Sequence, residues 1–573
     1  MRNFLKTTIA FLLFFVLIQN AFADKPAWPG IWTIWGKNDV SNFDKPWFKG
    51  TAGSITWKKI EPQKGKFDFK PIDDFVYKAV KNGLYFSFKV YSGYNVPDWI
   101  FENGVPKVLV DTVAYPYYLD EDYKMYFKNM IHKVAEHFKS YPENIRSKIA
   151  FIQCPAAVSG DPQPWYGKPN DPKYTIGYNS KEWEDYNAEI FSAYADAYKS
   201  INPPITLLTK PNENNFKKLL TYMSNLGVKT YTVAQGYQTN DDLKTEWMRE
   251  AISKFTPDGR AIRARGEVDH IDWMEKNWYN EAPVWNMYSQ CLWMLTYGLD
   301  ALMVREKHVS GENAIKHSTA YQFFADYAGY KSAEDSHGAW CALRDGLDYS
   351  DKVRFPEDKF GPIVNGRNID RYLKIANAFS ERGAKMGETE YCWTDGVTWT
   401  KKAKAMNDVA NNIWKDNYGM FMTQYKPNET SVGYWRVGSK EESYGRFARG
   451  FEHATGKNTL YFNIDDALFF NKPLAGAYPI EVKVIYFDSG KGKWELRYDA
   501  TSGSKTAFTV KKTNSKTWKV KKIQLKDAYF GNRCPNATDL MLVNSDTEDD
   551  IFHMIEVTRK TGDRKGFWGI ANH

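Results

Sequence analysis

One stretch combines a strand pattern with a cluster of polar residues: Ala261-Ile262-Arg263-Ala264-Arg265-Gly266-Glu267-Val268-Asp269-His270. Small and apolar residues alternate with arginines up to Gly266, which predicts a short strand that breaks at the glycine. Glu267, Asp269 and His270 follow at once. In a (β/α)8 barrel the catalytic groups stand at the C-terminal ends of the strands, so this order fits a barrel strand that carries a catalytic carboxylate. An edge strand ending in a solvated acidic turn explains the same residues, and the rest of the chain has to decide between the two.

The chain begins with an export pattern. Arg2 and Lys6 precede an apolar run from Thr7 to Ile18, and Ala21-Phe22-Ala23 fits a cleavage site before Asp24. This predicts a signal peptide over residues 1–23 and a secreted or periplasmic protein. No later stretch approaches the roughly 20 apolar residues of a membrane span.

Composition narrows the class of protein. The five cysteines are too few and too scattered for a disulfide framework or a C-x-x-C metal site, so we expect buried thiols or at most one or two bridges. Aromatic residues make up 16% of the chain, which fits large cores or rings that stack on sugars. Nucleic-acid-binding motifs are absent, and the net charge of +8 would suit an anionic glycan.

Strand and helix patterns alternate through the first half of the chain. Strands are expected at 30–35, 54–57, 84–90, 149–154, 205–209, 230–233, 261–266 and 299–304, with helices near 72–80, 122–140, 181–200, 284–296 and 314–329. This alternation predicts a (β/α)8 TIM barrel, in the α/β class, over residues 24–331.

The second half of the chain shows a different pattern of predicted helices and strands. Helix-like runs near 369–382 and 403–414 predict a helical extension over 332–430, packed on the barrel. Residues 431–573 hold short alternating strands separated by turns, which predicts an all-β, jelly-roll-like sandwich.

One motif carries a resemblance. Trp57-Lys58-Lys59-Ile60-Glu61-Pro62 runs on to Gly65 and Phe67-Asp68-Phe69, and a helix, a strand and Pro97-Asp98-Trp99 follow. This resembles the early barrel of clan A glycoside hydrolases and is most similar to family 42 β-galactosidases and their relatives that act on marine galactans, of agarase or carrageenase type. The resemblance implies an acid/base after strand 4 and a nucleophile after strand 7. The C-terminal sandwich resembles the carbohydrate-binding modules attached to such enzymes.

Glycoside hydrolysis needs two carboxyl groups, about 5–5.5 Å apart for retention and about 6.5–9.5 Å apart for inversion. Glu267 matches the nucleophile position of the clan, with Asp269 as the alternative or as a supporting group. Strand 4 departs from the clan, because it reads Gln153-Cys154-Pro155 and lacks the Asn-Glu pair. The first acid after it is Asp161, in a Ser-Gly-Asp turn similar to the turn that carries the general acid of β-amylases. We therefore take Asp161 as the general acid. Asp98, Glu184 or Glu306 could replace it, or the pair could be incomplete.

Other residues are candidates for binding substrate. The amides of Gln153 and Gln235 and the imidazole of His270 could hydrogen-bond sugar hydroxyls, and four tryptophans are either stacking platforms or core residues: Trp57, Trp99, Trp165 and Trp285. Cations recur in or just after barrel strands, namely Lys89, Lys210, Arg263, Arg265, Arg305 and Lys307. They either pair with nearby acids or form a cleft for sulfate or carboxylate groups. His132 and His137 lack metal-ligand spacing, so we expect no metal and no cofactor.

The sequence thus predicts a secreted, retaining glycoside hydrolase that cleaves a polysaccharide or its oligosaccharides, most plausibly a sulfated galactan. Two alternatives stay open. One is a glycan-binding protein with a degenerate barrel. The other is a polysaccharide lyase that uses a basic cleft to neutralise a uronate.

Overall fold

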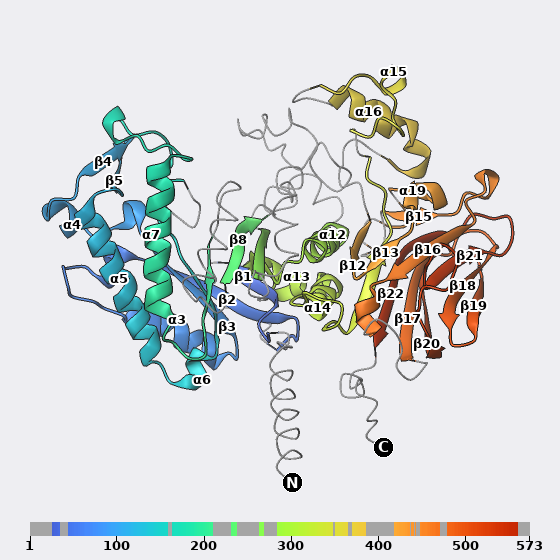
Figure 1. Ribbon diagram of the computed structural model, residues 1–573, viewed down its shortest axis with the longest axis horizontal. Helices are drawn as coiled ribbons and strands as arrows, with labels where there is room; N and C mark the ends of the chain where they lie inside the picture. Colours follow the sequence, from blue (N-terminus) through green and yellow to red (C-terminus); the bar gives the residue numbers. More distant parts are fainter. Residues whose placement is uncertain are drawn as a thin grey trace, which may run out of the picture.

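The computed structural model describes residues 26–34, 44–158, 163–209, 231–237, 263–268, 283–347, 350–364, 369–384, 417–435, 437–439, 442, 447–469 and 478–559. A barrel and a β-rich domain lie side by side, with α12 and α14 between them (Figure 1).

Eight parallel strands close into a barrel in the order β1-β10-β9-β8-β7-β6-β3-β2, which confirms the predicted fold class. The ring closes because β1 pairs with both β10 and β2. The strands are β1 (Gly30–Ile34), β2 (Phe48–Thr56), β3 (Tyr85–Tyr91), β6 (Ile149–Gln153), β7 (Thr206–Leu208), β8 (Tyr231–Tyr237), β9 (Arg263–Val268) and β10 (Ala301–Arg305).

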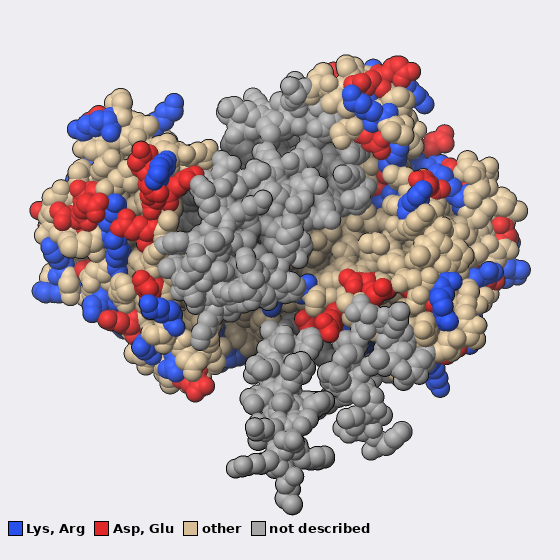
Figure 2. Space-filling view, in the orientation of Figure 1, with Lys and Arg blue, Asp and Glu red and all other residues tan. Residues whose placement is uncertain are grey.

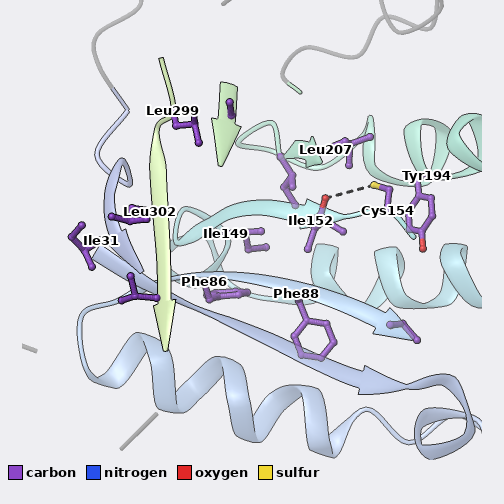
Figure 3. Close-up of a cluster of buried hydrophobic side chains, with 14 of the residues drawn as sticks. Ile31, Phe86, Phe88, Ile149, Ile152, Cys154, Tyr194, Leu207, Leu299 and Leu302 are labelled. Atoms are coloured by element: carbon purple, nitrogen blue, oxygen red, sulfur yellow. Dashed lines mark hydrogen bonds between the residues drawn. The ribbon is translucent and has the colours of Figure 1, made fainter. Parts of the chain in front are cut away.

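Helices cover the outside of the barrel. The longer ones are α3 (Lys70–Lys81), α5 (Glu121–Ser140), α7 (Lys181–Tyr198), α12 (Pro283–Thr296) and α14 (Ser318–Tyr327). The short ones are α2 (Trp57–Ile60), η1 (Gly93–Asn95), α4 (Trp99–Glu102), α6 (Glu143–Arg146), η2 (Pro172–Tyr174), η5 (Glu306–His308) and α13 (Gly311–Lys316). Outward-facing strand residues such as Phe88, Ile152 and Leu207 form the core under these helices, together with Tyr194 of α7 (Figure 3).

Inward-facing residues at the base of the barrel are apolar. Trp28, Trp32, Phe151, Leu208 and Met303 belong to one buried cluster there. The rings of Trp32 and Phe151 lie 5.3 Å apart between centroids. The base is therefore a packed core, as is usual for barrels of eight strands.

Two strand boundaries differ from the sequence prediction. Strand β2 begins at Phe48 rather than Ser54, because its first half is rich in small residues that carry little strand signal. The break expected at Gly266 is wrong, since β9 continues to Val268. A Cβ on Gly266 would lie 2.5 Å from Leu299 Cδ2 and 2.6 Å from Met294 Sδ. The glycine therefore lets α12 approach the strand and does not end it.

A hairpin after β3 was not predicted. Its strands are β4 (Lys107–Val110) and β5 (Val113–Pro116), and they pair antiparallel with each other. The loop after β6 packs on this hairpin, because Asn170 donates to the carbonyl of Asp111 at 2.8 Å and accepts from its N–H at 3.0 Å. The hairpin and this loop form a cap beside the C-terminal ends of β3 and β6.

The second domain is a twelve-stranded sheet whose pairs are antiparallel, as expected for a β-rich domain. Its strands are β11 (Gly338–Ala342), β12 (Tyr418–Met420), β13 (Met422–Gln424), β14 (Val432–Tyr434), β15 (Ala448–Gly450), β16 (Thr459–Ile464), β17 (Tyr478–Phe487), β18 (Lys493–Ala500), β19 (Gly503–Lys511), β20 (Trp518–Ala528), β21 (Leu540–Asn544) and β22 (Ile551–Arg559). The short helices η8 (His453–Thr455) and η9 (Asp466–Phe469) connect strands within it.

The segment 332–430, expected to be helical, contributes three of these strands. It contains α15 (Glu357–Phe360), α16 (Ile369–Ala378), η6 (Ser380–Arg382) and α19 (Pro427–Thr430), and also β11, β12 and β13. Strand β11 lies between β12 and β22 and is buried along its whole length. A strand buried on both faces lacks the polar–apolar alternation that marks a strand in sequence, which explains the difference.

The two domains share one hydrophobic core. Trp285 of α12 meets Phe447 with ring centroids 5.5 Å apart, and Phe323 of α14 meets Trp340 of β11 at 5.3 Å. Tyr327 also donates to Glu556 of β22 at 2.7 Å. Among the described helices, none is both long and apolar enough to cross a membrane.

Candidate active site

Strand β9 directs Arg265 and Glu267 into the barrel. Ala264 and Gly266 face the outer core, so the residues that alternate with them face inward. Arg265 Nη1 lies 2.5 Å from Glu267 Oε1 and 2.6 Å from Sδ of Met303, which belongs to the apolar cluster of the interior. The Glu267 side chain is 12% exposed. The ion pair holds this carboxylate in one orientation at the C-terminal end of the barrel, where the sequence placed the nucleophile.

Strands β3 and β6 add two more polar groups on the inner side. Phe88 and Ile152 face the outer core, so Lys89 and Gln153 face inward, and both are at least 95% buried. Lys89 Nζ lies 4.4 Å from the ring centroid of Tyr91. Within the described part of the chain, Gln153 Oε1 has no hydrogen-bond partner. Above its apolar base, the barrel is therefore lined by groups that can hydrogen-bond a polar ligand.

Arg265 has hydrogen-bond donors that the ion pair with Glu267 does not use. Its side chain is 2% exposed, Nη1 pairs with Glu267, and Nε and Nη2 have no hydrogen-bond partner among the described residues. A buried donor without a partner is costly, so such groups point to a ligand or to ordered water.

Arg263 does not join this group, although the sequence grouped the two arginines. It lies at the N-terminal end of β9, where Nη1 is 3.0 Å from Asp300 Oδ1 and 2.6 Å from the carbonyl of Gly329. Lys331 Nζ reaches the same buried Asp300 at 2.9 Å. This network fixes the base of the barrel, so the ion-pairing interpretation is correct for Arg263.

The chain that leaves β6 is anchored by hydroxyl groups. Tyr194 donates to the carbonyl of Pro155 at 3.3 Å, Tyr186 to that of Ala156 at 2.6 Å, and Ser92 to that of Ala157 at 2.8 Å. Burial raises the pKa of both tyrosines well above its usual value, so their hydroxyls remain protonated donors. Residues 154–158, here called the β6 stem, are thus fixed just before Asp161, which lies outside the described residues.

The four tryptophans proposed as stacking platforms are buried, at 0% exposed for Trp57, 7% for Trp99, 6% for Trp165 and 2% for Trp285. A platform needs an open ring face, and these rings pack on protein instead. Trp165 lies 4.8 Å from Tyr118 between ring centroids, and Trp57 lies 5.5 Å from Phe127. The stacking assignment is therefore wrong for these positions, and the core interpretation holds.

The motif that carries the family resemblance forms a hydrogen-bond network around Glu61, here called the Trp57–Glu61–Trp99 clasp. Trp57 Nε1 donates to Glu61 Oε2 at 2.7 Å, and the N–H of Gly65 donates to Oε1 at 2.9 Å. Trp99 Nε1 donates to the main-chain carbonyl of Glu61 at 3.0 Å. Burial raises the pKa of Glu61, but both its carboxylate oxygens are occupied, so this acid positions loops and is not placed to react.

The remaining candidates have different surroundings. Asp98 is exposed and pairs with Lys58 at 2.6 Å, Glu184 lies in the first turn of α7, and Glu306 opens η5 beside the exposed Arg305. Asp161, Lys210, Asp269 and His270 lie outside the described residues, and only the backbone of Gln235 on β8 is described. No group of three or more metal-binding side chains occurs among the described residues. The four described cysteines, Cys154, Cys291, Cys341 and Cys534, are free thiols and buried.

Comparisons with known proteins concern the first part of the barrel and its overall fold. Residues 31–149 match the model of glycosyl hydrolase family 42, described as "Beta-galactosidase". The barrel is therefore of the glycoside hydrolase type. The matched residues include β1, β2, β3 and the Trp57–Glu61–Trp99 clasp, whereas Glu267 lies beyond them.

Solved structures of glycoside hydrolases are similar to about half of the chain. The catalytic domain of β-amylase from Paenibacillus polymyxa aligns at 8% identity with a TM-score of 0.37, covering 53% of this chain and 98% of that one. Xylanase 10B from Thermotoga maritima aligns at 14% identity with a TM-score of 0.31, covering 49% of this chain and 86% of that one. No curated protein matches the chain.

Proposed function

We propose that this protein hydrolyses glycosidic bonds in a polysaccharide or its oligosaccharides, with Glu267 as nucleophile and Asp161 as acid/base. One observation carries the proposal. Glu267 is held by Arg265 inside the C-terminal end of a closed barrel, and the first half of that barrel matches a glycoside hydrolase family.

The proposed reaction follows the two-carboxylate, retaining course. The Glu267 carboxylate attacks the anomeric carbon and forms a glycosyl-enzyme bond, while the Asp161 carboxyl gives its proton to the departing glycosidic oxygen. Asp161 then takes a proton from water as the water attacks the anomeric carbon and releases Glu267. The anchored β6 stem supports this role for Asp161, because catalysis requires its acid to stand on a rigid support.

The proposed substrate is a galactose-type glycan, most readily a sulfated one, met outside the cytoplasm after export. Arg265 supports an anionic substrate, because two of its nitrogens have no hydrogen-bond partner among the described residues and a guanidinium binds sulfate or carboxylate oxygens through its planar fork. This arginine lies inside the barrel. On the face shown in Figure 2, by contrast, Lys and Arg are mixed with Asp and Glu over the described surface.

A second candidate function is glycan binding without cleavage. The sequence Gln153-Cys154 stands where the clan has Asn-Glu, and Ala156 and Ala157 follow in the stem. If Asp161 does not supply the acid, the inner polar groups would still bind sugar.

The test is turnover of the purified protein on neutral and sulfated galactans, with Glu267→Gln and Asp161→Asn run beside it. Glu136→Gln is the control, because this acid is exposed on the outer helix α5. We expect both site variants to lose at least about 10²–10³-fold in kcat and the control to stay at wild-type activity. Full activity of Asp161→Asn would remove its role. Products with an unsaturated end, which absorb in the near ultraviolet, would indicate a lyase. Binding without turnover would favour the second candidate.

A further inference from the structure

The cap beside β3 and β6 presents aromatic rings in two different environments. Tyr115 of β5 and Trp165 are buried, with centroids 5.6 Å apart. Tyr94 of η1 packs edge-on against Tyr115 at 5.6 Å. Tyr94 is nevertheless 47% exposed, and Tyr166, next to Trp165, is 48% exposed. A buried aromatic base thus holds two open tyrosine rings.

Residues next to Tyr94 contact the β6 stem. Gly93, directly before Tyr94, has φ of +60°, and a Cβ there would lie 2.9 Å from Val158 Cα. Ser92, one residue earlier, donates to the carbonyl of Ala157. Tyr94 therefore follows directly after two residues that contact the β6 stem, and Tyr166 follows the same stem along the chain.

The surroundings favour a sugar ring as the ligand. Tyrosine offers a flat apolar face and a hydroxyl at its edge, which matches a pyranose with its apolar face and polar rim. The two parts of the cap are held together, since Gly167 packs on Val110 and Asn170 bonds to Asp111. Little conformational freedom would therefore be lost on binding.

We propose that Tyr94 and Tyr166 form an aromatic subsite that stacks a sugar unit of the glycan chain away from the bond that is cleaved. The inference rests on the proposed function for the nature of the ligand. It adds the prediction that affinity for a chain of several sugars depends on these rings, whereas cleavage of a single attached sugar does not.

The experiment separates binding from turnover. Tyr94→Ala, Tyr166→Ala, the double variant and Tyr94→Phe are made in the Glu267→Gln background. The matched control is Tyr77→Ala, because Tyr77 is 52% exposed on the outer helix α3. Binding is measured by calorimetry with four hexasaccharides, from agarose, carrageenan, xylan and amylose. We expect the double variant to bind the preferred hexasaccharide at least about tenfold more weakly. Tyr77→Ala should bind as the parent does, and Tyr94→Phe, which keeps the ring face and loses only the hydroxyl, should lose less affinity than Tyr94→Ala.

Turnover gives the second readout. In the active background, the double variant should cleave nitrophenyl β-galactoside at the wild-type kcat/KM and show a raised KM only for longer chains. Equal affinity of the double variant and the Tyr77→Ala control would overturn the subsite, and so would binding of none of the four hexasaccharides by the parent. Binding that is weakened by the tyrosine variants without any turnover by the wild type would support the subsite while the proposed hydrolysis fails.

Discussion

At the scale of single residues, Arg265 is the group on which the site depends. It is buried, and its guanidinium forms an ion pair with the Glu267 carboxylate. A buried ion pair adds little net stability, but losing one partner leaves the other charge uncompensated.

Replacing Arg265 by Met should therefore reduce kcat by about 10²-fold through misplacement of Glu267. Arg265→Lys should retain part of the activity, since it keeps the charge and loses the fork. Steady-state kinetics on the substrate identified by turnover would measure both, with circular dichroism to verify folding. An Arg265→Met variant within twofold of wild-type kcat would show that the ion pair does not position the nucleophile.

Asp539 in the β-domain gives a prediction about pH. Burial raises its pKa from 3.8 to about 6, although it accepts hydrogen bonds from the N–H groups of Ile464 and Asn532. The folded state then binds a proton more tightly than the unfolded state does, so this group stabilises the fold most below pH 3.8. That contribution is lost as the pH rises towards 6, by about 3 kcal/mol for a shift of this size.

The Asp539→Asn variant lacks this titration. Denaturant unfolding of both proteins from pH 4 to 7 should show the wild type losing stability relative to the variant as the pH rises. Parallel stability curves over that range would contradict the assignment.

Residue identity alone predicted some of these positions and not others. A carboxylate directly after a barrel strand is a strong signal, which is why the sequence indicates Glu267 as a candidate nucleophile. The tryptophans were ambiguous, because a ring that stacks on sugar and a ring in a core have the same composition. The exposed tyrosines were missed for the related reason that exposure depends on the fold of the cap, and Tyr94 and Tyr166 follow no local pattern.

At the scale of elements, the spacing of apolar residues predicted strands and helices correctly where the element has one buried face. The helices α5 and α7 were found nearly residue for residue, since each carries a clear apolar period. Strand β11 and the first half of β2 were missed because buried or small residues run through them without alternation. Gly266 was misread as a break because a glycine inside a strand signals a close approach as readily as an end.

A substitution at Gly266 therefore tests whether β9 packs closely on α12. Gly266→Val places side-chain atoms against Leu299 and Met294, which already lie within 2.6 Å of a Cβ position. We expect the variant to lose about 1–3 kcal/mol of stability through overpacking between β9 and α12. Gly456→Val on the surface, where a Cβ meets nothing within 4 Å, controls for the loss of a glycine, although its positive φ adds backbone strain. Denaturant midpoints would compare the two. A Gly266→Val variant as stable as the wild type would show that α12 does not press on the strand.

At the scale of the whole molecule, the barrel and the β-domain belong to one folding unit. Helices α12 and α14 serve both, since they cover the barrel on one side and meet β11, β12 and β22 on the other. Trp340 and Met554 of the sheet belong to the same buried cluster as the barrel strands. Inter-domain contacts of this apolar kind couple two domains, whereas polar and smaller ones leave them free to move.

The coupling predicts how the protein unfolds. The wild type should unfold in one transition that far-ultraviolet dichroism and tryptophan fluorescence report at the same denaturant concentration. Trp340→Ala removes a fully buried ring that touches Phe323 and Tyr327, at a cost of about 3–5 kcal/mol. Because that loss falls on the contact between the domains, the single transition should split in two.

Trp494→Ala is the matched control. It removes an equally buried tryptophan from inside the β-domain, where the neighbours are Tyr486 and Phe552. Its cost should be similar, but the contact between the domains stays intact. The control should therefore lower the midpoint while both probes still coincide. If Trp340→Ala also kept coincident transitions, the domains would be coupled by contacts other than the α14–β11 packing. If the wild type itself unfolded in two steps, the shared core would not join the domains energetically.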